Sequence, residues 1–72
     1  NLSVIYPNPA TSVLQLYFKE DNNYRYEIYN PLGALQLIGE VSNHKNSIDI
    51  SSLTVGSYFI KVNGEVQRFN KI

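Results

Sequence analysis

The sequence predicts an all-β domain, a sandwich of seven short strands. Val, Ile, Thr, Tyr and Phe, which favour strands, account for 24 of the 72 residues, whereas Ala, the best helix former, occurs only twice. Turn signals also divide the chain at the spacing of roughly 8–12 residues that is typical of sandwiches. The expected strands are Leu2–Tyr6, Val13–Phe18, Tyr24–Asn30, Ala34–Val41, Ser47–Ile50, Ser57–Val62 and Val66–Lys71.

Alternation with a period of two assigns the faces of three of these strands. On each, one set of alternate side chains should point into the core. These sets are Leu14, Leu16 and Phe18; Tyr24, Tyr26 and Ile28; and Tyr58, Ile60 and Val62. The last strand is ambiguous, because Val66 and Phe69 have opposite parity and can share a face only across a β-bulge.

Turn sequences connect the strands. Asn63-Gly64 is typical of a type I′ hairpin, so the last two strands should be antiparallel neighbours. Asn30-Pro31-Leu32-Gly33 fits a type I turn between the third and fourth strands. Pro7-Asn8-Pro9 cannot be helical, because proline fixes its own φ and restricts the preceding residue. We expect this segment to cross from one sheet edge to another.

Leu53-x-x-Gly56-x-Tyr58 is similar to the tyrosine corner of Greek-key sandwiches. In that motif, a Tyr at the start of a strand donates its hydroxyl to backbone a few residues upstream. Ile60 stands where an immunoglobulin domain has its second Cys, and the chain has no Cys at all. The sequence therefore predicts a sandwich without a disulfide, with no thiolate metal site and no Cys nucleophile.

Charge and hydropathy exclude further classes of function. Six basic residues balance six acidic ones and the pI is about 6.8, which removes the electrostatic basis for binding nucleic acid or an anionic membrane. The apolar runs are far shorter than the roughly 20 residues of a transmembrane helix. We expect a single domain over residues 1–72, with no signal peptide and no initiator Met, cut from a longer polypeptide.

The polar residues offer only weak candidates for a catalytic or metal site. His44 and Asp49 with Ser47 or Ser51 suggest a catalytic triad, but nothing marks an oxyanion hole. Glu40 with His44 and Asp49 lacks the fixed spacing of metal ligands, and the Asp21-Asn22-Asn23 segment lacks that of a calcium loop. Solvated loops explain these residues more simply, so we expect no catalytic residue, metal or cofactor.

Surface residues leave two further alternatives open. Tyr17, Tyr29 and Phe59 should lie on outward faces, where aromatic rings can stack on sugars, although Tyr is also a common strand residue. Asn1-Leu2-Ser3 matches a glycosylation sequon, which is a weak signal. Arg68 and Lys71 are most simply the charges that protect an edge strand from aggregation.

Taken together, four blocks resemble the type A C-terminal sorting domain of the type IX secretion system. In order along the chain, they are Tyr6–Ala10 followed by Val13–Leu16, Tyr26–Asn30 through Gly33, Ile48–Leu53, and Gly56–Val62. The resemblance covers essentially the whole chain. It implies a seven-stranded immunoglobulin-like Greek-key sandwich at the C-terminus of a secreted protein, acting as a non-catalytic tag for export across the outer membrane of certain Gram-negative bacteria.

The resemblance also implies partners and recognition elements. A translocon would recognise the folded domain in the periplasm, an outer-membrane shuttle protein would collect the cargo, and a sortase would cut before Asn1. The cargo would then be released or held at the cell surface. The implied recognition residues are Pro7, Asn8, Pro9, Val66, Arg68, Phe69, Lys71 and Ile72. Many members end in a basic residue, whereas this chain ends in Ile72. The alternative function is a carbohydrate-binding or spacer module of a secreted hydrolase.

Overall fold

The computed structural model describes residues 2–20 and 22–72, and the strands within them lie close to the expected ones. No helix among these residues is long and apolar enough to cross a membrane. The strands are β1 (Leu2–Tyr6), β2 (Val13–Phe18), β3 (Asn23–Tyr29), β4 (Leu35–Ser42), β5 (Ser47–Asp49), β6 (Gly56–Val62) and β7 (Glu65–Lys71).

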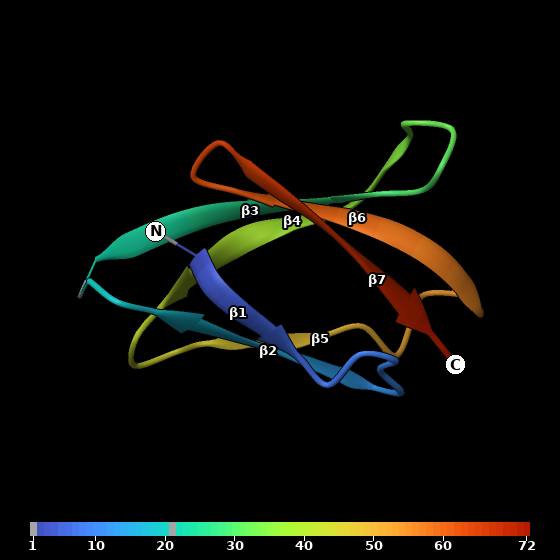
Figure 1. Cartoon of the computed structure of the whole chain (residues 1–72). Helices are drawn as coiled ribbons and strands as arrows, with labels where there is room; N and C mark the ends of the chain where they lie inside the picture. The colour runs from blue at the N-terminus through green and yellow to red at the C-terminus, as the bar shows by residue number, and fades with distance from the viewer. Residues whose placement is uncertain (1, 21) are drawn as a thin grey trace.

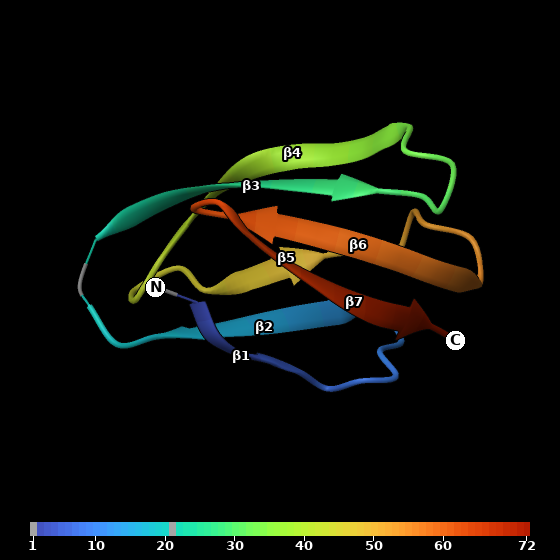
Figure 2. The same ribbon diagram turned by 45° about the horizontal axis from the view of Figure 1, so that its top comes forward.

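Two antiparallel sheets pack face to face. One sheet has the order β1-β2-β5 and the other has the order β4-β3-β6-β7. Figure 1 shows the two layers, with β7 running down from the larger sheet toward the end of the smaller one, and Figure 2 shows the order of the strands within each layer. The expectation of an all-β sandwich is confirmed in this form.

The core between the sheets contains the side chains that alternation places there, except that Tyr26 is only partly buried and packs against the core. Phe18 and Tyr24, which come from different sheets, stack with their ring centroids 4.2 Å apart. Among the residues with described side chains, no polar or charged side chain other than the tyrosines is buried. The buried set is Ala10, Leu14, Leu16, Phe18, Tyr24, Ile28, Val41, Ile48, Ile50, Leu53, Tyr58, Ile60, Val62 and Phe69.

The ambiguity in the last strand has a simple resolution. The register between β6 and β7 runs without a shift from Gly56↔Lys71 to Val62↔Glu65, so this ladder contains no bulge. Phe69 is fully buried, whereas Val66 points outward and is 58% exposed. The two side chains therefore lie on opposite faces, as an unbroken strand requires.

The turns form as their sequences predict. Asn63 and Gly64 have φ values of 51° and 81°, the two positive angles of a type I′ turn, and they join β6 to β7. At the β3–β4 turn, the Gly33 N–H donates to the Asn30 carbonyl at 2.9 Å. The Asn30 side-chain oxygen also accepts bonds from the N–H groups of Leu32 and Ala34, at 3.0 and 2.9 Å.

The tyrosine corner is also present. Tyr58 lies in β6, is 5% exposed, and donates its hydroxyl to the Thr54 carbonyl at 2.7 Å. The same hydroxyl lies 3.1 Å from Thr54 Oγ1. Leu53 N–H donates to the Ile50 carbonyl at 3.0 Å, which closes the turn that precedes the corner. The motif therefore ties the loop after β5 to the start of β6.

Candidate recognition surface

The segment Pro7–Ala10, which we call the strap, crosses from the smaller sheet to the outer edge of β7. Ala10 forms a parallel bridge with Lys71. Its N–H donates to the Asn70 carbonyl at 2.8 Å, and its carbonyl accepts the Ile72 N–H at 2.8 Å. The expectation that the proline segment crosses between sheet edges is thus confirmed, and both peptide bonds that precede its prolines are cis.

The two implied recognition elements therefore meet, although they lie at opposite ends of the sequence. Asn8 joins them through its side chain, which contacts residues 60 and 62 positions further along the chain. Its Nδ2 donates to the Arg68 carbonyl at 3.4 Å, and its Oδ1 accepts the Asn70 N–H at 3.0 Å. Figure 2 shows the end of β7 lying over the strap.

The side chains of β7 differ in what they can offer a partner. Val66, Arg68 and Asn70 share the outward face and are exposed, as is Ile72. Phe69 points into the core, where its ring stacks against Tyr58 with centroids 5.7 Å apart. In the folded domain, the Phe69 side chain therefore supports the strand from within the core and does not reach the surface.

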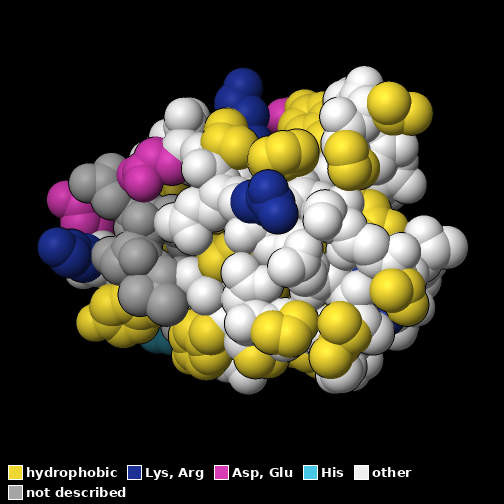
Figure 3. All heavy atoms as spheres, turned by 45° about the vertical axis from the view of Figure 1, so that its right-hand side comes forward, with side chains coloured by type: hydrophobic (Ala, Val, Ile, Leu, Met, Phe, Trp, Pro, Cys, Tyr) yellow, Lys and Arg dark blue, Asp and Glu magenta, His cyan; other side chains and the backbone are white. Residues whose placement is uncertain are grey.

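The outer face of the larger sheet continues the surface beside β7. Strand register places one row across it from β4 to β7 as Leu35, Tyr29, Phe59 and Arg68, and a second row as Ile38, Glu27, Lys61 and Val66. The face therefore mixes apolar side chains with cations. Figure 3 shows hydrophobic side chains scattered over one side of the molecule, with a Lys or Arg side chain near the middle of the view.

Glu27 organises the charges on this face. It accepts a hydrogen bond from the Tyr29 hydroxyl at 2.6 Å, and one of its oxygens lies 3.8 Å from Arg25 Nε. The bond to Glu27 raises the pKa of Tyr29 above its usual value, because it stabilises the protonated phenol. The Glu27 carboxylate thus has partners in Tyr29 and Arg25. In contrast, no ion pair within the described chain involves Lys61 or Arg68.

Of the candidate triad, Asp49 and Ser51 are hydrogen-bonded to each other. The Asp49 carboxylate accepts bonds from the backbone N–H and the hydroxyl of Ser51, at 2.9 and 2.7 Å. These bonds hold the pKa of Asp49 below its ordinary value and cap the turn that follows β5. Within residues 2–20 and 22–72, no group of three His, Asp or Glu side chains could hold a metal ion. Asp21 of the calcium candidate and Asn1 of the sequon lie outside the described residues.

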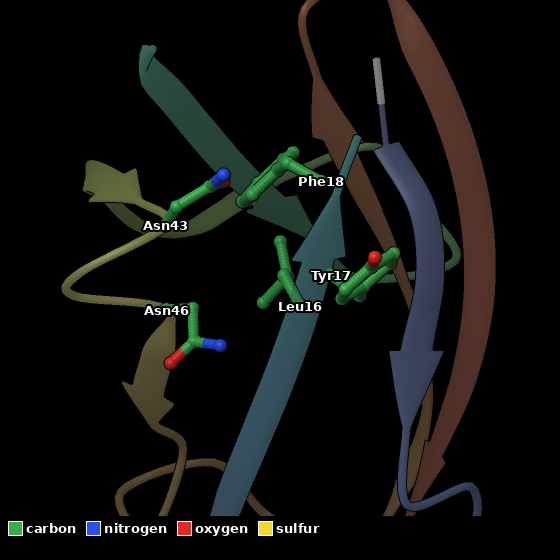
Figure 4. A pocket seen from close by; sticks show the side chains of 5 residues that line it. All are labelled: Leu16, Tyr17, Phe18, Asn43 and Asn46. Atoms are coloured by element: carbon green, nitrogen blue, oxygen red, sulfur yellow. The ribbon is translucent and has the colours of Figure 1, made fainter. Parts of the chain in front are cut away.

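The hollows of the surface are shallow. One, of about 280 Å³, lies between the end of β2 and the β4–β5 loop and is lined by Leu16, Tyr17, Phe18, Asn43 and Asn46. In Figure 4, Tyr17 points to the opposite side of β2 from Leu16 and the two Asn side chains. The polar groups of this lining are two amides and the Tyr17 hydroxyl, and none of its side chains carries a formal charge at neutral pH.

The three aromatic residues proposed for sugar binding do not come together. Tyr29 and Phe59 are cross-strand neighbours on the larger sheet. Tyr17 lies on the smaller sheet, where it is 56% exposed. The structure therefore brings only two of the three candidates onto one face.

Three residues that shape the recognition surface could not be identified from local sequence patterns. Ala10 is buried at the bridge, Asn70 bonds the Asn8 side chain and the Ala10 N–H, and Ser57 donates its hydroxyl to Asn70 Oδ1 at 2.9 Å. Parity places Asn70 on an outward face, but nothing local indicates that the strap docks there. That contact depends on tertiary structure.

Comparison with known proteins gives one match. The family model described as the secretion system C-terminal sorting domain matches residues 4–72. No curated protein and no solved structure matches the chain. The match spans nearly the whole sequence and includes both the strap and β7.

Proposed function

The chain belongs to the family of type IX secretion system C-terminal sorting domains, and from this premise we propose that it is a non-catalytic export signal, read as a folded domain. The observation that supports a folded signal is the contact between the strap and β7. Two segments from opposite ends of the chain form one surface only when the sandwich is closed. An unfolded tail would present them separately.

We further propose that the sandwich is of the immunoglobulin-like Greek-key class, in the type A form of the sorting domain. In a constant-type immunoglobulin sandwich, the first, second, fifth and fourth strands form one sheet, and the third, sixth and seventh form the other. Here β4 pairs with β3 instead, which leaves β1-β2-β5 as a three-stranded sheet. The tyrosine corner at Tyr58 supports this class.

The proposed route has three partners. The outer-membrane translocon recognises the domain in the periplasm of a Gram-negative bacterium, an outer-membrane shuttle protein collects the cargo, and a sortase removes the domain by cutting before Asn1. The cargo is then secreted or held at the cell surface. The domain's part is to bind, and it has no chemical step to perform.

The surface that makes this contact consists of the strap together with Val66, Arg68, Lys71 and Ile72. Val66 and Ile72 are more than half exposed, at 58% and 57%. Arg68 supplies a cation with no acidic partner in the described chain. The complementary surface on the translocon is therefore apolar with acidic groups, since matched charges steer association and fix orientation.

Export of a reporter tests the proposal. A fusion that carries an N-terminal Sec signal and this domain at its C-terminus should leave cells that have the machinery, and deletion of Val66 to Ile72 should trap it in the periplasm. Because that deletion also removes buried Phe69, Val66→Glu combined with Arg68→Glu is the sharper variant: both side chains point outward, so the fold should survive. Leu32→Glu, at a turn residue that is 93% exposed, is the matched control. Undiminished export of the double variant would refute this surface.

A further inference from the structure

The backbone of Ala10 sets up a parallel ladder with β7. Ala10 bonds the Asn70 carbonyl and the Ile72 N–H, which flank its bridge partner Lys71. A parallel ladder repeats every two residues. If it continued, the backbone of Asn8, two residues before Ala10, would bond the groups of β7 that lie two residues before those bonded by Ala10. For Asn8, these groups are the Arg68 carbonyl and the Asn70 N–H.

The side chain of Asn8 contacts these same two groups. Its Nδ2 donates to the Arg68 carbonyl and its Oδ1 accepts the Asn70 N–H. A carboxamide carries the same donor and acceptor as a peptide group, so it can replace one in a ladder. Pro7 and Pro9 on either side have no N–H to offer. The carboxamide therefore extends the pairing along β7 by one repeat where the flanking backbone lacks donors.

We propose that Asn8 is a positioning residue for recognition: its carboxamide substitutes for a strand, holds residues 68–72 in place, and closes their edge. This inference rests on the proposed export function. With the edge closed, a component of the secretion machinery reads the outward side chains of β7 and does not add a strand of its own there. An open edge would be a template for such addition.

The network extends across the sheet to β6 through Asn70. Its backbone N–H bonds Asn8, its carbonyl accepts the Ala10 N–H, and its side-chain oxygen accepts the Ser57 hydroxyl from β6. Asn70 is thus held from both sides of β7. Loss of the Asn8 carboxamide removes the bond to the Asn70 N–H on the strap side and leaves the bonds to Ala10 and Ser57 intact.

Hydrogen exchange and export, measured on the same reporter fusion, test this role. Asn8→Ala removes both contacts, so the amides of Asn70 and Ile72 should exchange about tenfold faster relative to those of β3. Asn8→Asp keeps the acceptor for the Asn70 amide and loses the donor to Arg68. It should therefore leave the Asn70 amide better protected than Asn8→Ala does. We expect export to fall at least several-fold in Asn8→Ala.

Two controls separate positioning from general stability. Asn43→Ala removes an exposed loop amide, and Ile48→Val weakens the core in β5 away from the strap by an amount similar to the loss of a hydrogen bond. Both should leave export unchanged.

The other possible results would contradict the strand substitution, the positioning role or the proposed function. Unchanged exchange at Asn70 and Ile72 in Asn8→Ala would overturn the strand substitution. Faster exchange with full export, or an equal loss of export in Ile48→Val, would overturn the positioning role. If the unaltered domain failed to export the reporter at all, the proposed function would fall, and the exchange data alone would still decide whether Asn8 holds β7.

Discussion

Asn8, Asn30 and Tyr58 each use a side chain to satisfy backbone groups that lie outside the sheet ladders. The Asn8 side chain bonds the edge of β7, the Asn30 side chain bonds the β3–β4 turn, and the Tyr58 hydroxyl bonds the loop before β6. In each case the geometry needs a particular donor or acceptor, so a substitution of similar size can remove the contact without changing the packing. These positions are therefore where single-atom variants are most informative.

Tyr58→Phe should lower the free energy of unfolding by about 1–3 kcal/mol, because it leaves the Thr54 carbonyl without its donor. The midpoint of urea denaturation measures this loss. Tyr17→Phe is the matched control. Tyr17 is 56% exposed, so the loss of its hydroxyl should change the free energy of unfolding little. Equal midpoints for Tyr58→Phe and the unaltered domain would contradict the tyrosine corner.

Asp49 should give the domain an acid-dependent element of stability. Bonds from Ser51 lower its folded-state pKa below 3.8, so its contribution is fully present above the unfolded pKa. It is lost as pH falls through the lowered folded pKa. An NMR titration of the Asp49 carboxyl should show the low pKa, and Ser51→Ala should raise it toward 3.8. A pKa that does not move in Ser51→Ala would show that the Ser51 hydroxyl plays no part.

At the scale of elements, regular strands are the part that the sequence predicts well. β2 and β6 alternate cleanly, so their core faces follow from the order of their residues. The core face of β7 does not follow from its residue order, because Val66 and Phe69 are both apolar. Only the pairing with β6 shows which of the two faces inward. The bulge in β4 cannot be predicted from the residue order either. Tyr29 pairs with Leu35 and Ile28 pairs with Leu37, so Gln36 has no partner in the ladder.

The recognition surface illustrates the same limit. Pro7-Asn8-Pro9 could be predicted to cross between edges, because proline chemistry is local. Its docking on β7 could not, since the Asn8 side chain meets groups 60 and 62 residues away. Pairing across so long a separation depends on the closed sandwich, and no pattern within a short window encodes it.

The β6–β7 hairpin sets the position of the last strand, and Gly64 supplies one of the two positive φ angles of its turn. Gly64 has a φ of 81°, and a Cβ added there would meet no atom within 4 Å. Gly64→Ala should therefore cost only the backbone strain of a left-handed residue, about 1–2 kcal/mol. Chemical denaturation measures this cost, and Gly64→Asn, which tolerates positive φ, should recover part of it. Full stability of the Ala variant would contradict the type I′ turn.

The whole molecule is a compact unit that offers a partner its outer surface. Its radius of gyration is 11.1 Å, close to the roughly 11 Å expected of a compact domain of this length. No buried side-chain polar atom in the described part lacks a hydrogen-bond partner. The residues alone could exclude classes of chemistry, but only the order and spacing of four motif blocks indicated a sorting role. A binding surface without a reactive group has no local signature.

A sorting signal that serves as a folded module should fold independently of what precedes it. We expect the unfolding midpoint of the domain to be the same when it follows two unrelated, more stable reporter proteins, because its core is built from its own strands. Denaturation followed through the domain's own tyrosine signals, in isotopically labelled fusions, measures the midpoint. Phe69→Ala should lower the free energy of unfolding in both fusions by about 3–5 kcal/mol, the usual cost of deleting a buried aromatic ring. A midpoint that depends on the reporter would mean that the cargo supplies part of the fold, and the machinery would then be reading cargo and domain together.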